Sequence, residues 1–120
     1  MAKDDYDYIV FRILTYLYAC MKRKCCFDEN VFAHSIITDK VSEEYMTDVL
    51  RIMSSEGLVE GVTFTKAWGH TYILLADLSE MGITGEGIRY VLNNDKMKLV
   101  RNKILESTPG MIAELIKLAL

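Results

Sequence analysis

Hydrophobic residues recur every three or four positions along the first part of the chain, which is the spacing of one helix face. Between residues 5 and 23 the stripe consists of Ile9, Val10, Ile13, Leu14, Leu17 and Met21. Aspartates precede it and Lys22, Arg23 and Lys24 follow it, so both ends suit the helix dipole. The pattern predicts a first helix over residues 5–23.

Two further helices are predicted before residue 57. Asp28 can cap a short helix with the apolar residues Val31, Phe32 and Ile36, which the turn 38–40 ends. Ser42 can then accept a hydrogen bond from an unpaired N–H of a third helix. The apolar positions of that helix are Met46, Val49, Leu50 and Met53, and Gly57 stands where a left-handed C-cap belongs.

Strand-like composition follows in residues 58–64 and 70–75, joined by the Gly-containing link 65–69. This spacing predicts a β-hairpin. After a linker at 77–82, Ile83 is expected to form a brief third strand near the hairpin. Three helices followed by a hairpin are typical of a winged helix-turn-helix.

The remaining residues predict more helices. Thr84 can cap a helix carrying Ile88, Val91 and Leu92, and Asn93-Asn94-Asp95 should break or bend it before the segment 97–105. Thr108 as N-cap and Pro109 at the first helical position start a last helix over 110–120. That helix is apolar on nearly every side, so it should pack on the first helix or on a second copy through Met111, Ile112, Leu115 and Ile116.

The sequence therefore predicts a mostly α, α+β fold: a winged helix-turn-helix of three helices plus a β-hairpin wing, with additional C-terminal helices. Residues 1–94 would be the winged-helix domain and residues 95–120 a helical extension for packing or dimerisation. The 120 residues suffice for one core. No apolar run is long enough for a membrane span and no signal peptide is recognisable, so we expect a soluble cytoplasmic protein.

The cysteines favour reduced thiols over metal binding. Cys20, Cys25 and Cys26 form an odd set, and zinc ligation together with His34 would be the alternative. That set lacks the C-x-x-C spacing, and adjacent side chains rarely converge on one ion. His34 is expected to be a packed or surface histidine. We expect no metal and no cofactor.

No catalytic motif is present: the chain has no nucleophile elbow, phosphate-binding loop or His-x-x-x-His pair. The glycines at 82, 85 and 87 do not follow a strand of a βαβ unit, and they serve a turn and the start of a helix. The sequence predicts a protein that is not an enzyme.

Charge limits the possible binding modes. The formal net charge is −3, so nucleic acid would need a local basic patch. The third helix holds the recognition position, yet it carries Glu43, Glu44, Asp48 and Glu56 against a single Arg51. Such a helix suits phosphates poorly.

The expected wing is more compatible with nucleic-acid binding than the third helix. Lys66 and Trp68 lie at its tip, where the tryptophan could stack on a base, anchor a protein interface or fold back onto the sheet. Candidate phosphate contacts are Lys22, Arg23, Lys24 and Arg51. The densest basic stretch, Lys96, Lys98, Arg101 and Lys103, is either a phosphate-contacting face or the solvated side of a helix.

The segment Ile83-Thr84-Gly85-Glu86-Gly87-Ile88-Arg89-Tyr90-Val91, with Ser42-Glu43-Glu44-Tyr45 and residues 56–61, resembles the YjcQ family over residues 5–94. The resemblance implies a small winged-helix protein of Gram-positive bacteria, their prophages and mobile elements. It also implies a regulatory or DNA-associated role with no established reaction and no catalytic residues.

These observations leave two functions open. The first is a DNA-binding or transcription-associated regulator, expected to be a homodimer that holds double-stranded DNA with Lys66, Trp68 and the phosphate-contact candidates. The alternative is a protein-interaction module. In that alternative Glu43, Glu44 and Asp48 dock on a basic partner, for example as an inhibitor of a host nucleic-acid-targeting defence.

Overall fold

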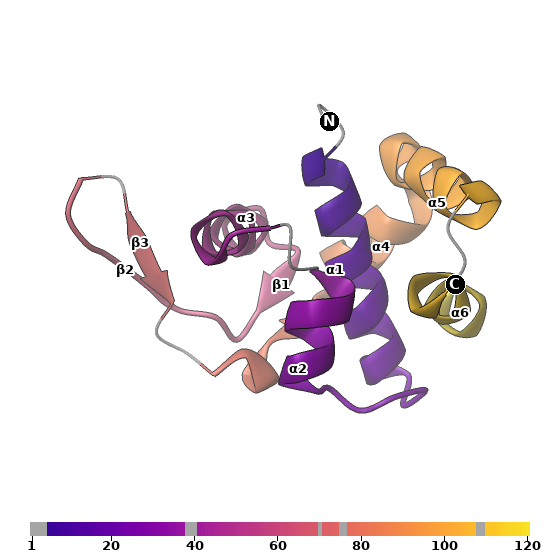
Figure 1. Ribbon diagram of the computed structural model, residues 1–120, viewed down its shortest axis with the longest axis horizontal. Helices are drawn as coiled ribbons and strands as arrows, with labels where there is room; N and C mark the ends of the chain where they lie inside the picture. The colour runs from indigo at the N-terminus through magenta and orange to yellow at the C-terminus, as the bar shows by residue number, and fades with distance from the viewer. Residues whose placement is uncertain (1–4, 38–40, 70, 75–76, 108–109) are drawn as a thin grey trace.

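The computed structural model describes residues 5–37, 41–69, 71–74, 77–107 and 110–120. These ranges form a mostly helical α+β fold with two small antiparallel sheets (Figure 1), so the predicted fold class is confirmed at that level. The elements are α1 (Asp5–Met21), α2 (Glu29–Val31), α3 (Glu43–Ser55), β1 (Val59–Glu60), β2 (Phe64–Lys66), β3 (Tyr72–Leu74), β4 (Gly82–Ile83), α4 (Gly85–Asn93), α5 (Asp95–Ser107) and α6 (Met111–Ala119).

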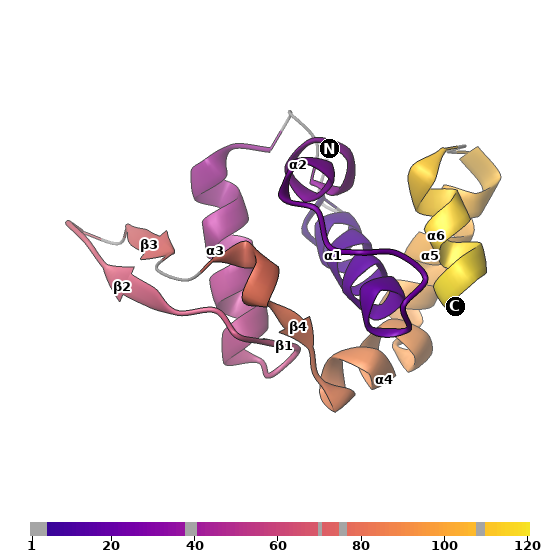
Figure 2. The same cartoon turned by 90° about the horizontal axis from the view of Figure 1, so that it is seen from below.

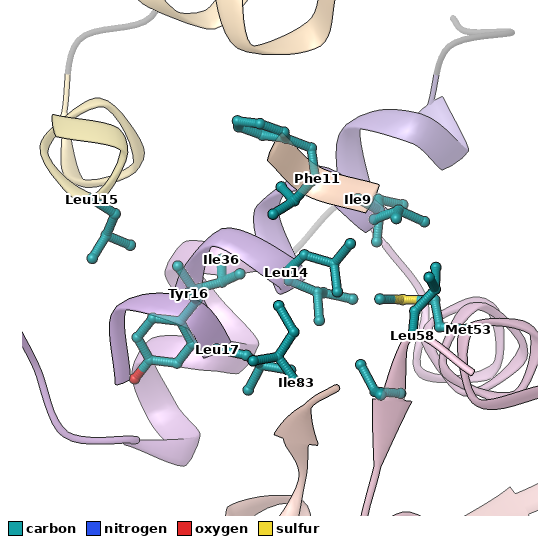
Figure 3. Packing of buried hydrophobic residues seen from close by; sticks show 14 of the residues in the cluster. Ile9, Phe11, Leu14, Tyr16, Leu17, Ile36, Met53, Leu58, Ile83 and Leu115 are labelled. Carbon is teal, nitrogen blue, oxygen red and sulfur yellow. The ribbon is translucent and has the colours of Figure 1, made fainter. Parts of the chain in front are cut away.

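Helix α1 is the centre of the molecule. It contacts α3, α4, α5, α6 and β4, and Phe11, Ile13 and Leu14 are completely buried. Figure 3 shows Leu14, Leu17 and Met53 pointing into the same core, with Leu115 of α6 approaching from the other side. A helix surrounded in this way has to be apolar on most of its faces. None of the helices in the described ranges is both long and apolar enough to cross a membrane.

The helix caps predicted at Asp28, Ser42 and Thr84 are confirmed. The Asp28 carboxylate accepts from the N–H groups of Asn30 and Val31, Ser42 Oγ accepts from Tyr45 N at 3.1 Å, and Thr84 Oγ1 accepts from Gly87 N at 3.0 Å. Local side-chain chemistry therefore sets where α2, α3 and α4 begin.

The second helix differs from the prediction in its geometry. After one α-helical turn it widens into a π-type turn over Phe32–Ile36, where Ile37 N donates to Phe32 O. The wider turn places Phe32, Ile36 and Ile37 together in the core, and all three are buried.

Helix α1 ends at Met21, two residues before the predicted end. Lys24 N donates to Ala19 O and Arg23 N to Cys20 O, a Schellman ending in which Arg23 takes the left-handed position with φ 62°. Gly57 holds the same position after α3, as predicted, with φ 78°. An arginine pays a steric penalty there that a glycine avoids.

Because of that penalty, Arg23→Gly is expected to raise the free energy of unfolding by about 1 kcal/mol. Urea denaturation followed by circular dichroism measures the change. Arg23→Ala is the matched control, since it removes the guanidinium but keeps the β-carbon, and it should give no such gain. Equal effects of the two substitutions would contradict the conformational explanation.

The predicted single strand over 58–64 is divided into β1 and β2 at Gly61. Gly61 has φ 85°, and a β-carbon there would collide with the carbonyl of Glu80. Strand β1 pairs with β4 (Val59↔Ile83), whereas β2 pairs with β3 (Phe64↔Leu74) to form the hairpin. The brief strand expected at Ile83 is therefore confirmed, at the base of the hairpin. Positions 70 and 75 of the predicted second strand lie outside the described residues.

Helices α5 and α6 cover the opposite side of α1 from α3 and the hairpin (Figure 2). Asn94 separates α4 from α5, as predicted, and its side chain accepts from Lys96 N and Met97 N. Helix α6 packs on α1, with Ile112, Leu115 and Ile116 buried and Met111 exposed. Of the two alternatives for this helix, packing within the chain is the one observed. Thr108 and Pro109 lie outside the described residues.

Candidate binding face on α3 and the hairpin

The hairpin packs against α3, and together they form one exposed face. Its exposed residues, which we call the α3–hairpin face, are Glu43, Glu44 and the half-exposed Asp48 of α3, with Lys66, Trp68 and Ile73 of the hairpin. Strand β3 contacts α3 directly, and the guanidinium carbon of Arg51 lies 4.3 Å from the centre of the Tyr72 ring. This cation–π contact fixes the hairpin to the helix.

Trp68 lies at the tip of the hairpin and is 94% exposed. The turn that presents it is closed by hydrogen bonds from Ala67 N to Thr71 O and from Thr71 N to Trp68 O, with Gly69 at φ 65°. The possibility that this tryptophan folds back onto the sheet is therefore wrong. Base stacking and a protein anchor remain as its possible uses.

A groove runs between the start of α3 and the hairpin. One part, of about 430 Å³, is lined by Glu43, Glu44, Met46, Thr47, Tyr72 and Leu74. A second part, of about 400 Å³, continues towards α2 and shares Glu43, Met46 and Leu78 with the first. The floor is apolar and the rim carries carboxylates.

The Arg51 side chain makes its contacts within the protein. Its guanidinium stacks on Tyr72, and its Nε lies 3.8 Å from the Asp48 carboxylate. The cation expected to touch phosphates from α3 therefore holds the hairpin instead, and the outward side of α3 is dominated by carboxylates.

The predicted phosphate contacts after α1 lie away from the hairpin. Lys22 Nζ donates to Ala119 O of α6 at 3.0 Å and lies 5.0 Å from the centre of the Tyr18 ring. Helix α6 is on the far side of α1 from the hairpin in both Figure 1 and Figure 2. The structure therefore does not bring Lys22, Arg23 and Lys24 together with Lys66 and Trp68.

The basic stretch of α5 is also remote from the hairpin. Lys96 Nζ lies 3.9 Å from the Asp7 carboxylate, Lys98 is exposed and Arg101 is half-buried. Lys103 is exposed as well, and Leu99 is exposed between the cations. The molecule thus carries its acidic helix and its basic helix on opposite sides of α1.

Cys20 lies in the last turn of α1, and Cys25 and Cys26 lie in the link to α2. Cys20 Sγ and Cys25 Sγ are 3.6 Å apart, and Cys26 is exposed. Burial, followed by the contact with Cys25, raises the pKa of the Cys20 thiol to about 12. His34 is exposed on the π-type turn that continues α2. Across the described side chains, no group of three or more His, Cys, Asp or Glu residues could hold a metal ion.

Ile73 belongs to the face although it was not among the candidate residues predicted from the sequence. It is 50% exposed. An alternating strand such as Tyr72-Ile73-Leu74 has one inward and one outward side, and the sequence does not say which is which. The contact between Tyr72 and Arg51 turns Tyr72 towards α3 and leaves Ile73 on the outward side.

Trp68→Ala is expected to leave the free energy of unfolding unchanged within about 0.5 kcal/mol, because the indole makes little buried contact. Phe32→Ala is the contrasting variant, since that side chain is completely buried and should lose about 3 kcal/mol or more. Urea denaturation of both variants tests this. A large loss for Trp68→Ala would mean that the tip is part of the core.

A family model described as YjcQ protein matches residues 11–107. No curated protein and no solved structure matches the chain. The family match spans α1 from Phe11 onward, all of α2, α3 and the hairpin, and the helices α4 and α5. It includes the whole α3–hairpin face and covers well over half of the chain. The chain therefore belongs to the YjcQ family.

Proposed function

We propose that this chain is a non-enzymatic winged-helix protein that binds a basic protein surface through the α3–hairpin face. The observation that carries the proposal is the groove beside α3, which combines an apolar floor that includes the half-buried Tyr72 with a carboxylate rim. A fold alone does not define a partner, so the proposal rests on this surface.

The winged-helix assignment is supported by the order and packing of the elements. Helices α1, α2 and α3 are followed directly by a hairpin that packs on α3. Helix α3 then occupies the position of a recognition helix, and the β2–β3 hairpin that of a wing.

Charge favours a basic partner over a phosphate backbone. Glu43 and Glu44 are exposed in the first turn of α3, where base contacts are usually made. Arg51, the cation of that helix, is held by Asp48 and Tyr72. Carboxylates arranged in this way would be repelled by DNA and would steer a basic surface towards the face.

The apolar part of the face can contribute binding energy that charge alone does not. Ile73 and the half-buried Tyr72 line the groove, Trp68 is exposed at the hairpin tip, and aromatic side chains are enriched among the residues that carry most of the binding energy of protein interfaces. We infer that the partner presents an amphipathic segment with apolar side chains towards Met46 and Leu78 and cations towards the carboxylates.

DNA binding is a second candidate, favoured by a specific observation at the hairpin tip. Lys66 and Trp68 are both exposed there, a cation beside an aromatic ring. Such a tip can contact a phosphate and stack on a base. In this mode a transcription-associated regulator would act as a homodimer with two hairpins on one duplex.

Fluorescence anisotropy with two labelled probes tests the proposal. One probe is random duplex DNA, and the other is a synthetic amphipathic helix of lysine and leucine, here called the lysine–leucine peptide. We expect the peptide to bind at near-physiological salt and the duplex to bind weakly even at low salt. Duplex binding that is weakened by both Lys66→Ala and Trp68→Ala would favour the second candidate and overturn the first.

A further inference from the structure

We propose that Cys20 and Cys25 form a reversible intramolecular disulfide when the protein meets a peroxide. The two sulfur atoms are 3.6 Å apart across the end of α1. A disulfide bond is about 2.05 Å long, so the sulfurs need to approach by only about 1.5 Å. This inference is independent of the proposed binding function.

The loop that carries Cys25 is held on both sides of the pair. Tyr16 Oη donates to Cys26 O at 3.3 Å and accepts from Asp28 N at 2.9 Å, which fixes the chain just after Cys25. Before it, the left-handed residue Arg23 turns the chain back towards Cys20. These backbone contacts hold Cys25 next to Cys20.

A small oxidant can reach the pair. Cys20, Cys25 and Cys26 line one cavity of about 710 Å³, which also includes Arg23, Met81 and Gly82. Cys20 and Cys25 are half-buried, and Cys26 is exposed. A molecule as small as hydrogen peroxide fits this space with ease.

The geometry selects Cys20 with Cys25 over a bond between the neighbours Cys25 and Cys26. Adjacent α-carbons are about 3.8 Å apart, whereas disulfides need about 4.4 Å or more. Cys26 also has its backbone tied to Tyr16. An adjacent bridge would therefore be strained, whereas the sulfur atoms of Cys20 and Cys25 already lie 3.6 Å apart.

The reaction balances with hydrogen peroxide as the oxidant. The thiolate form of Cys25 attacks one peroxide oxygen, so an S–O bond forms, the O–O bond breaks and hydroxide leaves. The Cys20 sulfur then attacks the Cys25 sulfenic acid. The S–S bond forms, the S–O bond breaks, and the Cys20 proton joins the leaving hydroxide as water. The hydroxide from the first step takes up the proton that the Cys25 thiol lost, so two thiols are oxidised to one disulfide and one peroxide is reduced to two molecules of water.

Burial explains why the Cys20 thiol still carries its proton when it reacts. Because burial raises the pKa of this thiol to about 12, Cys20 keeps its proton near neutral pH and is the second thiol to react. In the reduced protein, alkylation by iodoacetamide should accordingly modify Cys20 more slowly than Cys26.

The test uses the full chain with Cys26→Ser, and Cys26→Ala as a second variant, treated with hydrogen peroxide. By mass spectrometry we expect a single chain, not linked to a second copy, whose mass is lower by two hydrogen atoms. Dithiothreitol should restore the original mass. Trypsin cleaves after Lys22, Arg23 and Lys24, so the peptides with Cys20 and Cys25 should stay joined until reduction.

The matched controls are the double variants Cys20→Ser with Cys26→Ser, and Cys25→Ser with Cys26→Ser, which should form no internal bond. Circular dichroism of the reduced variants checks that they fold. Three results would overturn the proposal: sulfinic acid without a linkage, disulfides only between chains, or no reaction with peroxide at all.

Discussion

Replacing Gly87 with alanine is expected to lower the free energy of unfolding by about 3 kcal/mol. Gly87 is buried in the first turn of α4, where it packs against Leu58, just before β1, and against Ile83 of β4. A β-carbon there would collide with the carbonyl of Leu58 and lie 2.8 Å from Ile83 Cγ1. The Leu58 carbonyl also accepts from Thr84 N, so it cannot move without disturbing the start of α4.

Gly85→Ala is the matched control for this prediction. It lies in the same turn, and its β-carbon would only meet the Arg89 guanidinium at an ordinary 3.5 Å. Its exposed position and helical backbone should make alanine neutral or slightly stabilising. Urea denaturation compares the two variants, and similar stabilities would mean that α4 does not pack as closely on Leu58 as described.

Reversing the charges of Glu43, Glu44 and Asp48 to lysine is expected to weaken binding of the lysine–leucine peptide by about a hundredfold. Each exposed ion pair contributes up to about 1 kcal/mol, and reversal adds repulsion to that loss. The helix should persist, because Ser42 still caps it. Anisotropy titration at near-physiological salt measures the change.

The control for that experiment changes the net charge equally on another part of the surface. Glu86, Glu106 and Glu114 are exposed on α4, α5 and α6. Their replacement by lysine should leave peptide binding within a few-fold of the original. If both triple variants bind equally poorly, the effect comes from total charge and the α3–hairpin face is not the docking site.

The helix boundaries could be predicted where one side chain decides them. Asp28, Ser42 and Thr84 act on N–H groups two or three residues away, and Gly57 adopts a backbone conformation that suits glycine. The division of the strand at Gly61 could not be predicted, because it depends on the carbonyl of Glu80. That contact exists only once the chain has folded.

The candidate site could be predicted in its charge but not in its arrangement. The carboxylates of α3 follow from residue types and helical position. The separation of Lys22 from Lys66 depends on the packing of α6 beside α1, where Ala119 accepts from Lys22. The exposure of Trp68 depends on how the hairpin rests on α3 through Arg51 and Tyr72. Homodimerisation stays a prediction, with three of its four expected residues buried within the chain.

The most direct test of a docking face on α3 and the hairpin is a map of amide chemical shifts in the isotope-labelled protein. The lysine–leucine peptide and random duplex DNA are titrated separately at near-physiological salt. We expect the peptide to shift residues 43–48 and 71–74 together with the Trp68 indole, and the duplex to shift none of them. Shifts by the duplex at Lys66 and Trp68, without any response of α3 to the peptide, would contradict the proposed face.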